Sequence, residues 1–240
     1  MMIPLRRACL VVLAAIFLGA AAPATAPVAP APSGLLGKPI QLFNGKDLDG
    51  WVWYQRPPKT ATAPAVVDIA AVWSVKDGLL RCEGKPTGYI RTANEYGGNY
   101  ILTVEQRHLA KGNGGILFAL TGADKIWPRC LEVQAQTGEE GDIRNIADFK
   151  LTMDESRVEP KRLRRLGPSS EKPPGEWEAV QIIVDNGNLT ITLNGQLQNI
   201  ARYTESLAGR IGLQSEGGEM EFRKIEITPI ETAADERAVR

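Results

Sequence analysis

The chain has 240 residues, with 28 basic and 28 acidic side chains, and therefore carries no formal net charge at pH 7. Nucleic-acid binding requires an excess of cationic side chains that displace counterions, so this balance excludes a nucleic acid as the expected partner. The length leaves room for one domain of about two hundred residues with short terminal segments.

The N-terminal residues predict export. Arg6 and Arg7 precede an apolar run over residues 8–22, and the alanines around its end offer small-x-small cleavage sites. This order is typical of a secretory signal peptide, and the run is too short to span a bilayer comfortably. We therefore predict a signal peptide over residues 1–26 and a periplasmic or secreted mature protein with no membrane attachment after cleavage.

The mature chain is predicted to hold one folded domain. Proline and alanine dominate residues 27–37, and because repeated proline favours an extended chain, this segment is predicted to be a linker. The domain is expected over residues 38–230, followed by a polar tail over residues 231–240. Cys82 and Cys130 remain after cleavage, and the sequence leaves open whether they form a disulfide or stay as buried thiols.

Strand patterns fill the domain, and helical periodicity is absent over any three turns. Three turns carry hairpin chemistry: Lys76-Asp77-Gly78, Asn186-Gly187-Asn188 and Asn194-Gly195. Tyr100 to His108 alternates like a strand, with His108 on the apolar side. A last hairpin is expected from Arg210 to Ser215 and Glu219 to Thr228 around two glycines. Many strands with closely spaced turns predict an all-β sandwich or barrel.

Polar side chains recur on one face of several predicted strands. From Cys130 to Gln136, Leu131, Val133 and Ala135 share one face, whereas Glu132, Gln134 and Gln136 share the other. The same alternation groups Gln214 with Glu216, and Glu105 with Arg107. On neighbouring strands, these rows would form a polar face suited to sugar hydroxyls, with Trp127 available for stacking on a sugar ring. The alternative is an ordinary solvated sheet face.

Several phrases together resemble one family. They are Leu42-Phe43-Asn44-Gly45-Lys46-Asp47-Leu48-Asp49-Gly50-Trp51, Trp73-Ser74-Val75-Lys76-Asp77-Gly78, Gly112-Asn113-Gly114-Gly115-Ile116, Trp127-Pro128-Arg129-Cys130-Leu131-Glu132-Val133-Gln134, Gly141-Asp142, and Gly212-Leu213-Gln214-Ser215-Glu216-Gly217-Gly218. In this order they resemble the 3-keto-disaccharide hydrolase family, also described as 3-keto-glucoside 1,2-lyase/3-keto-2-hydroxy-glucal hydratase domains. The resemblance implies a concanavalin A-like jelly roll of two antiparallel sheets that cleaves glycosides oxidised at C3.

The resemblance also implies roles for particular residues. A C3 ketone acidifies the C2 hydrogen, so a carboxylate can act as the general base for elimination, and hydration follows. The expected catalytic residues are Glu132 as base or ligand, Asp142 from the Gly-Asp loop, and Arg107, which stabilises the enolate. Expected substrate-binding residues are Gln134, Glu105, Arg129, Trp127, Gln214 and Glu216. Arg129 is an alternative to Arg107 at the enolate.

Other functions remain open at this stage. Departures from the family pattern at Gly114, Ala119 and Glu178 keep a non-catalytic, lectin-like carbohydrate-binding module as the alternative to the enzyme, because the same fold serves both. A structural sandwich that binds a protein partner is the third possibility. No cofactor is expected with certainty. A divalent cation is conceivable on the acidic face, although no ligand spacing demands it.

Overall fold

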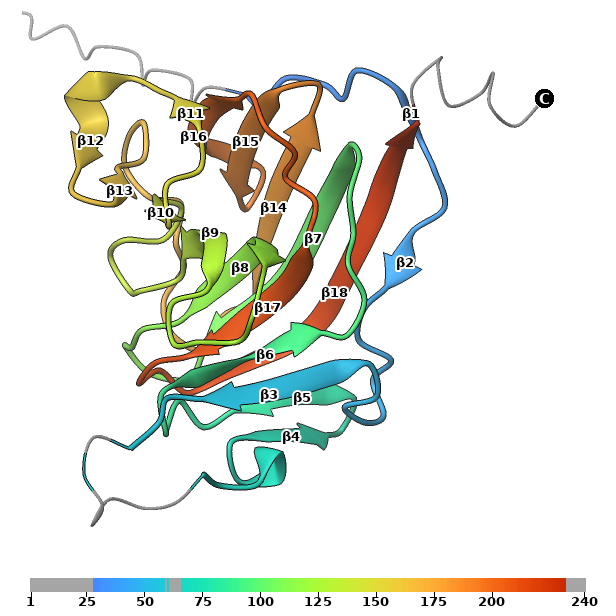
Figure 1. Ribbon diagram of the computed structural model, residues 1–240, viewed down its shortest axis with the longest axis vertical. Helices are drawn as coiled ribbons and strands as arrows, with labels where there is room; N and C mark the ends of the chain where they lie inside the picture. The colour runs from blue at the N-terminus through green and yellow to red at the C-terminus, as the bar shows by residue number, and fades with distance from the viewer. Residues whose placement is uncertain (1–27, 59, 61–65, 232–240) are drawn as a thin grey trace, which may run out of the picture.

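The computed structural model describes residues 28–58, 60 and 66–231. The predicted signal peptide and almost all of the predicted polar tail lie outside these residues. Two sheets pack face to face, and the described chain contains two short 3₁₀ turns, η1 (Ile69–Ala71) and η2 (Glu155–Arg157), but no α-helix. The protein is a jelly-roll sandwich of two antiparallel sheets, as predicted (Figure 1).

The two sheets have different strand orders. The larger sheet runs β11 (Leu151–Thr152), β16 (Gln196–Tyr203), β15 (Asn188–Leu193), β14 (Glu178–Asp185), β7 (Tyr100–His108), β18 (Met220–Glu231), β5 (Leu79–Cys82) and β4 (Trp73–Lys76), and β1 (Leu35–Leu36) and β2 (Ile40–Gln41) also pair with β18. The smaller sheet runs β12 (Val158–Glu159), β13 (Arg162–Leu163), β10 (Ile143–Ile146), β9 (Arg129–Gln134), β8 (Gly115–Thr121), β17 (Arg210–Ser215), β6 (Gly88–Thr92) and β3 (Trp51–Gln55).

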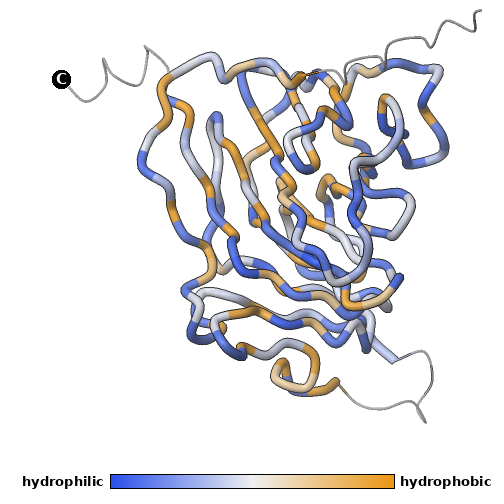
Figure 2. The backbone as a smooth tube through the Cα atoms, turned by 180° about the vertical axis from the view of Figure 1, so that it is seen from behind, coloured by the Kyte–Doolittle hydropathy of each residue, from blue (hydrophilic) through white to orange (hydrophobic). Residues whose placement is uncertain are grey.

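The core lies between the sheets. Alternate residues of β7, β14, β9 and β8 point into it, so hydrophobic and hydrophilic positions alternate along the strands in Figure 2. Among the largest fully buried side chains are Trp73, Tyr100, Phe118 and Phe222. Because burial of about 25 cal/mol per Å² of apolar surface is the main favourable term in folding, this alternation fixes which face of each strand is left for function.

Local turn chemistry was predicted correctly. Asp77 and Gly78, Asn186 and Gly187, and Asn194 and Gly195 all have positive φ, as two-residue hairpin turns require. Strand pairing also includes Leu35, Leu36 and Glu231, just outside the expected domain limits.

The predicted last hairpin is wrong. β17 lies in the smaller sheet, whereas β18 lies in the larger sheet between β7 and β5. The connection through Gly217 and Gly218 crosses from one sheet to the other. A side chain at Gly218 would clash with the backbone of Asn113, 2.7 Å from its carbonyl oxygen. The glycines therefore serve a close crossing rather than a tight turn.

Two further features concern cysteine and membranes. Cys82 on β5 and Cys130 on β9 lie on different sheets, and both are buried free thiols. None of the helices in the described part of the chain has the length and apolar character that a bilayer crossing requires.

Candidate functional site

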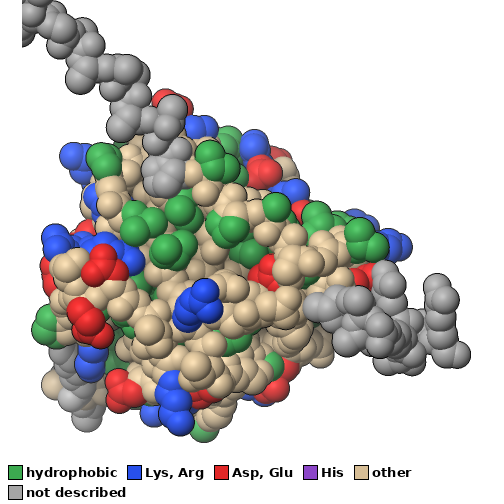
Figure 3. All heavy atoms as spheres, turned by 90° about the horizontal axis from the view of Figure 1, so that it is seen from above, with side chains coloured by type: hydrophobic (Ala, Val, Ile, Leu, Met, Phe, Trp, Pro, Cys, Tyr) green, Lys and Arg blue, Asp and Glu red, His purple; other side chains and the backbone are tan. Residues whose placement is uncertain are grey.

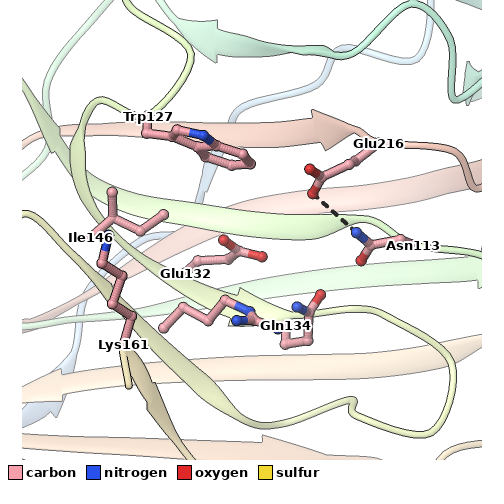
Figure 4. A pocket seen from close by; sticks show the side chains of 8 residues that line it. Asn113, Trp127, Glu132, Gln134, Ile146, Lys161 and Glu216 are labelled. Atoms are coloured by element: carbon pink, nitrogen blue, oxygen red, sulfur yellow. Dashed lines mark hydrogen bonds between the residues drawn. The ribbon is translucent and has the colours of Figure 1, made fainter. Parts of the chain in front are cut away.

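A cavity of about 370 Å³ opens on the outer face of the smaller sheet. Its lining residues are Asn113, Trp127, Glu132, Gln134, Arg144, Ile146, Lys161 and Glu216. Figure 4 shows the Glu132 side chain at the centre of this group, with Trp127 on one side and Gln134 on the other. Three members of the predicted rows, Glu132, Gln134 and Glu216, line this cavity, although β8 separates their strands. The fourth, Gln214, lines an adjoining narrow hollow that shares Trp127 and Ile146 with the cavity.

Glu132 is buried at the floor of the cavity, with 2% of its surface exposed. It pairs with Leu117 of β8 on one side and with Arg144 of β10 on the other. Leu117 and Cys130 belong to a small apolar cluster on this outer face. Burial raises the pKa of the Glu132 carboxyl from 4.5 to about 8, Glu216 adds to the rise by repulsion, and Arg144 opposes it. This carboxyl therefore accepts or releases a proton near neutral pH.

The two sides of Glu132 differ in charge. On the β17 side, Glu216 accepts a hydrogen bond from Asn113 Nδ2 at 3.0 Å, and its pKa is raised, mainly by burial. On the β10 side lie Arg144 and Lys161. Arg144 Nη2 is 3.3 Å from Glu139 Oε2, a loose ion pair that leaves most of its donors for a ligand. The cavity thus has a carboxyl end and a cationic end, with Glu132 between them.

Gly115 lets two side chains converge over β8. A Cβ atom at this position would lie 2.7 Å from Glu132 Oε1 and 2.8 Å from Gln214 Oε1. Gln214 is 4% exposed, and its Oε1 has no hydrogen-bond partner among the described residues. A buried acceptor without a partner is costly, so a hydrogen-bond donor is expected at this point when a ligand binds.

Trp127 is held at the rim by its own loop. Asp124 in this loop accepts hydrogen bonds from Arg91 Nε and Nη2, both at 2.7 Å, and from the Tyr89 hydroxyl at 3.1 Å. The Arg56 guanidinium lies 5.8 Å from the centre of the Trp127 ring. A bidentate arginine–carboxylate pair fixes the loop, so Trp127 offers a flat apolar surface, 42% exposed, to a sugar ring.

Three predicted site residues lie elsewhere. Glu105 and Arg107 are on β7 in the larger sheet, where Glu105 pairs with Arg223 at 2.5 Å and Arg107 pairs with Glu221 at 2.6 Å. Arg129 pairs with Glu205 at 2.7 Å and packs over the Phe149 ring. None of the three lines the cavity, so neither of the arginines expected at an enolate is in place for that role.

Asp142 is buried in an ion-pair network instead of facing the cavity. Its Oδ2 accepts hydrogen bonds from Arg162 at 2.6 Å (Nε) and 2.5 Å (Nη2), and its Oδ1 accepts one from the Arg165 backbone N–H at 2.7 Å. These contacts attach the β12–β13 hairpin, and with it Lys161, to the start of β10.

The Asp142→Asn variant is therefore expected to lose stability rather than catalysis. The amide still accepts from the Arg165 N–H, but the Arg162 guanidinium loses its buried anion and retains only the more exposed Glu139 and Glu159. This loss should cost about 2–4 kcal/mol in free energy of unfolding. Denaturant titration gives this quantity. A loss of kcat of a hundredfold or more in folded protein, the size expected for a general acid or base, would contradict the structural role.

The residues missed by sequence reasoning are mostly on the cationic side. Arg144 was not among the predicted site residues; it lies on β10, a strand of four residues. Lys161 belongs to a basic run that includes Arg162 and Arg164, which are charge-paired. Asn113 was seen only as part of a motif. Pairing of β10 with β9 brings these residues together, and that pairing is not visible in local sequence.

A second buried titratable cluster lies at the end of β7. His108 Nε2 donates to the Ala135 carbonyl at 2.6 Å and lies 3.1 Å from Glu140 Oε1. Glu140 also interacts with Glu178, which accepts a hydrogen bond from the Lys172 backbone N–H. Burial raises the pKa of both carboxyls, and the contact with Glu140 raises that of Glu178 further. Burial lowers the pKa of His108, which was correctly predicted to pack inside.

The Glu178→Gln variant is expected to be more stable than the parent protein at alkaline pH. A raised pKa means that the folded state holds a proton that the unfolded chain has released, so this residue's contribution to the free energy of unfolding falls as pH rises above 4.5. Glutamine retains an acceptor for Lys172 and a donor for Glu140. The gain should be about 1–2 kcal/mol at pH 8 and smaller near pH 6. Denaturant titrations at both pH values, with exposed Glu155→Gln as control, test the sign.

A second hollow, of about 690 Å³, lies beside the outer face of β14, β15 and β16. Ile183, Ile200 and Leu166 are among its lining residues. Figure 3 shows hydrophobic side chains gathered on the end of the molecule that carries β11, β15 and β16 in Figure 1. Asp185, its most buried carboxylate, is bound by the backbone N–H and hydroxyl of Ser33. The hollow therefore lacks the free buried carboxyl that distinguishes the cavity at Glu132.

Metal binding has little support in the described ranges. Residues 28–58, 60 and 66–231 contain no group of three or more His, Cys, Asp or Glu side chains arranged to hold a metal ion. The divalent cation considered for the acidic face has no such site there.

Comparison with known proteins identifies the family. The sequence matches the model of the 3-keto-alpha-glucoside-1,2-lyase-like domain over residues 38–228. The chain belongs to this family. The predicted resemblance is confirmed, and the matched region contains all of the smaller sheet, most of the larger sheet and every residue that lines the cavity. No curated protein matches the chain.

Solved structures share the fold of this 3-keto-alpha-glucoside-1,2-lyase-like domain at low identity. A proposed glycosyl hydrolase from Parabacteroides distasonis is 19% identical, with a TM-score of 0.56, over 80% of this chain and 94% of that one. A protein with a galectin-like fold from Bacillus subtilis is 13% identical, with a TM-score of 0.53, over 82% of this chain and 98% of that one. The carbohydrate-binding module CBM66 from Bacillus subtilis is 10% identical, with a TM-score of 0.50, over 74% of this chain and 94% of that one. These structures show the fold, and the family match supports a protein that acts on carbohydrate.

Proposed function

We propose that this protein is an exported enzyme that cleaves 3-keto glycosides or disaccharides by elimination followed by hydration. The observation that carries the proposal is Glu132, a buried carboxyl with a pKa of about 8, placed between a carboxyl end and a cationic end of one cavity. Elimination across C1 and C2 of a 3-keto sugar needs a base at C2, positive charge at the C3 oxygen, and an acid at the C1 oxygen. The cavity offers all three groups, with the base Glu132 between the cationic end and the carboxyl end.

The first half-reaction breaks the glycosidic bond. Ionised Glu132 removes the C2 proton, and the C–H electron pair forms an enolate whose negative oxygen faces Arg144, with Lys161 beyond it. The enolate then re-forms the C3 carbonyl, a double bond forms between C1 and C2, and the bond from C1 to the leaving oxygen breaks. Protonated Glu216 supplies the proton that the leaving oxygen needs. The product is a 3-keto-2-hydroxyglucal and a free alcohol.

The second half-reaction adds water. Water attacks C1, which is activated by conjugation with the ketone, and its proton passes to the ionised Glu216. Glu132 returns a proton to C2, so both carboxyls regain their starting states. Repulsion between the two carboxyls favours a single shared proton near neutral pH, as this exchange of roles requires.

The same cavity suits catalysis better than binding alone. A lectin-like site needs exposed amides and aromatic rings, and Gln134 and Trp127 would serve that role. Binding of neutral hydroxyls does not require a carboxyl desolvated strongly enough to raise its pKa to about 8, because solvated amides and carboxylates bind them as well. Such perturbed groups are concentrated at catalytic sites.

The test uses the mature domain, a 3-keto-glucoside and the parent glucoside in deuterated water, with and without chelator. We expect release of the alcohol from the 3-keto sugar only, with deuterium at C2 of the released sugar and no effect of the chelator. Saturable binding of the 3-keto-glucoside without release or C2 exchange would contradict the proposal and favour a lectin-like module.

Export is part of this proposal. The support is the order of Arg6-Arg7, the apolar run and the small residues that follow, all outside the described residues. Expression in a bacterial host with fractionation should place the protein in the periplasm or medium, with its N-terminus near residue 27. Recovery of the intact N-terminus in the cytoplasm would contradict export.

A further inference from the structure

Two side-chain oxygens converge above Gly115, one at the floor of the cavity and one just beyond it. A Cβ atom on Gly115 would lie 2.7 Å from Glu132 Oε1 and 2.8 Å from Gln214 Oε1. Glu132 lines the cavity, whereas Gln214 lines a narrow adjoining hollow that shares Trp127 and Ile146 with it. Glu132 is 2% exposed and Gln214 is 4% exposed, and Gln214 Oε1 has no hydrogen-bond partner among the described residues. The cavity therefore presents one base and, next to it in the adjoining hollow, one acceptor that lacks a donor.

Carbon 2 of a glycoside carries two substituents that suit the Glu132 base and the Gln214 acceptor. In the proposed reaction its hydrogen goes to Glu132, which requires this carbon to approach the floor. Its other exocyclic substituent is a hydroxyl group, which is a hydrogen-bond donor. A sugar whose C2 edge enters the floor therefore offers a hydrogen to the base and a hydroxyl to an acceptor next to the base.

We infer that Gln214 selects substrates that carry a C2 hydroxyl group by accepting its hydrogen bond, which turns the C2 hydrogen toward Glu132. This inference rests on the proposed function and adds the substrate class to it: glycosides with an unmodified 2-hydroxyl, in the configuration that places hydrogen and hydroxyl on the correct oxygens. Gln214 is a specificity residue because it touches the substrate but takes no proton from it.

The charged residues on the two sides of Glu132 support this orientation of the sugar ring. With C2 at Glu132, C3 lies toward Arg144 on β10 and C1 toward Glu216 on the β17 side. Gln214 and Glu216 are two residues apart on the same side of the chain segment. In this orientation the 2-hydroxyl donates a hydrogen bond to Gln214, and the C1 oxygen receives its proton from Glu216. Each substrate group therefore has its own side chain.

Substrate discrimination provides the test. The 3-keto-glucoside, its 2-deoxy analogue and its C2 epimer are compared by kcat/KM, each divided by its rate of hydroxide-catalysed elimination to remove differences in intrinsic C2 acidity. A site built around a hydroxyl rejects the analogue that lacks it, because its buried acceptor stays unpaired. We expect the wild type to favour the parent over the 2-deoxy sugar by about a hundredfold or more. The epimer, whose two C2 substituents are exchanged, should not react.

Variants assign the discrimination to Gln214. Gln214→Met removes the acceptor at similar size and should reduce the preference for the parent over the 2-deoxy sugar to below about tenfold, whereas Gln214→Glu retains an acceptor and should retain the preference. Gln181→Met, on β14 in the opposite sheet, is the matched control. Circular dichroism shows whether each variant is folded, and the wild-type comparison needs no variant.

The outcomes separate this inference from the proposed function. Similar corrected kcat/KM for the parent and 2-deoxy sugars in the wild type would overturn the role of Gln214 while elimination stands. Undiminished discrimination in folded Gln214→Met would do the same. Failure to cleave either sugar would overturn the proposed function and this inference with it.

Discussion

The Glu132→Gln variant is expected to lose about a thousandfold or more in kcat on a 3-keto-glucoside, together with deuterium incorporation at C2. Glutamine has the same shape but cannot accept the C2 proton. The amide is neutral, as Glu132 itself is over most of the range below pH 8, so the cavity should keep its packing. Chromatography of the released alcohol and mass spectrometry of the sugar measure both losses.

The pH dependence of the parent enzyme follows from the same carboxyl. Burial raises the pKa of Glu132 to about 8, and a base works only in its ionised form. The need for an ionised Glu132 makes kcat/KM rise with pH, and the need for a protonated Glu216, whose pKa is also raised by burial, makes it fall again. The profile of kcat/KM against pH should therefore be bell-shaped, with a slope of about tenfold per pH unit on each limb. The residual activity of Glu132→Gln should lack the rising limb.

The control for this variant is Glu221→Gln. Glu221 is a buried carboxylate on the opposite sheet, paired with Arg107, and its loss tests whether any buried glutamate matters for activity.

Because a neutral side chain no longer has to hold a proton in the folded state, Glu132→Gln should match or exceed the parent in free energy of unfolding at pH 8. Retained C2 exchange in folded Glu132→Gln would show that another group is the base.

Alternation along a strand explains which parts of the site were predictable. Glu132 and Gln134 were expected to share a face because Leu131 and Val133 needed the core, and the structure places them so. Glu105 and Arg107 show the same pattern but belong to the larger sheet. Alternation says which residues of one strand point together. It does not say which sheet the strand joins, because pairing depends on distant segments.

Charged residues were the least predictable part of the site. Asp142 follows a glycine in a family motif, yet Arg162 and Arg165 surround it. Arg129 is the first residue of the strand that carries Glu132, yet its side chain pairs with Glu205. Arg144, which does reach the cavity, was not among the predicted site residues. A buried charge needs a partner, and that partner comes from whichever segment the fold brings near. Local sequence therefore identifies candidate charges but not their pairs.

The Gly115→Ala variant is expected to reduce kcat/KM by about a hundredfold or more while the protein still folds. The new Cβ atom would lie 2.7 Å from Glu132 Oε1, 3.0 Å from Glu132 Cδ and 2.8 Å from Gln214 Oε1. Real Cβ contacts are longer than this, so both side chains must move. Displacement of a catalytic group by about 1 Å can cost a hundredfold in rate, because proton transfer needs the base within hydrogen-bond reach.

At Gly115, an effect of alanine on catalysis can be distinguished from an effect on folding. Gly115 has no positive φ, so alanine fits the backbone, and the obstructing atoms are ends of side chains rather than backbone. The loss of stability should stay within the range of about 1–3 kcal/mol that overpacking costs. Gly167→Ala is the matched control, because its Cβ would meet nothing within 4 Å and its φ is also not positive. Melting curves and kcat/KM for both variants make the comparison. Parent-like activity in folded Gly115→Ala would mean that the convergence of Glu132 and Gln214 over β8 is not needed for the reaction, and would leave Glu132 to act alone.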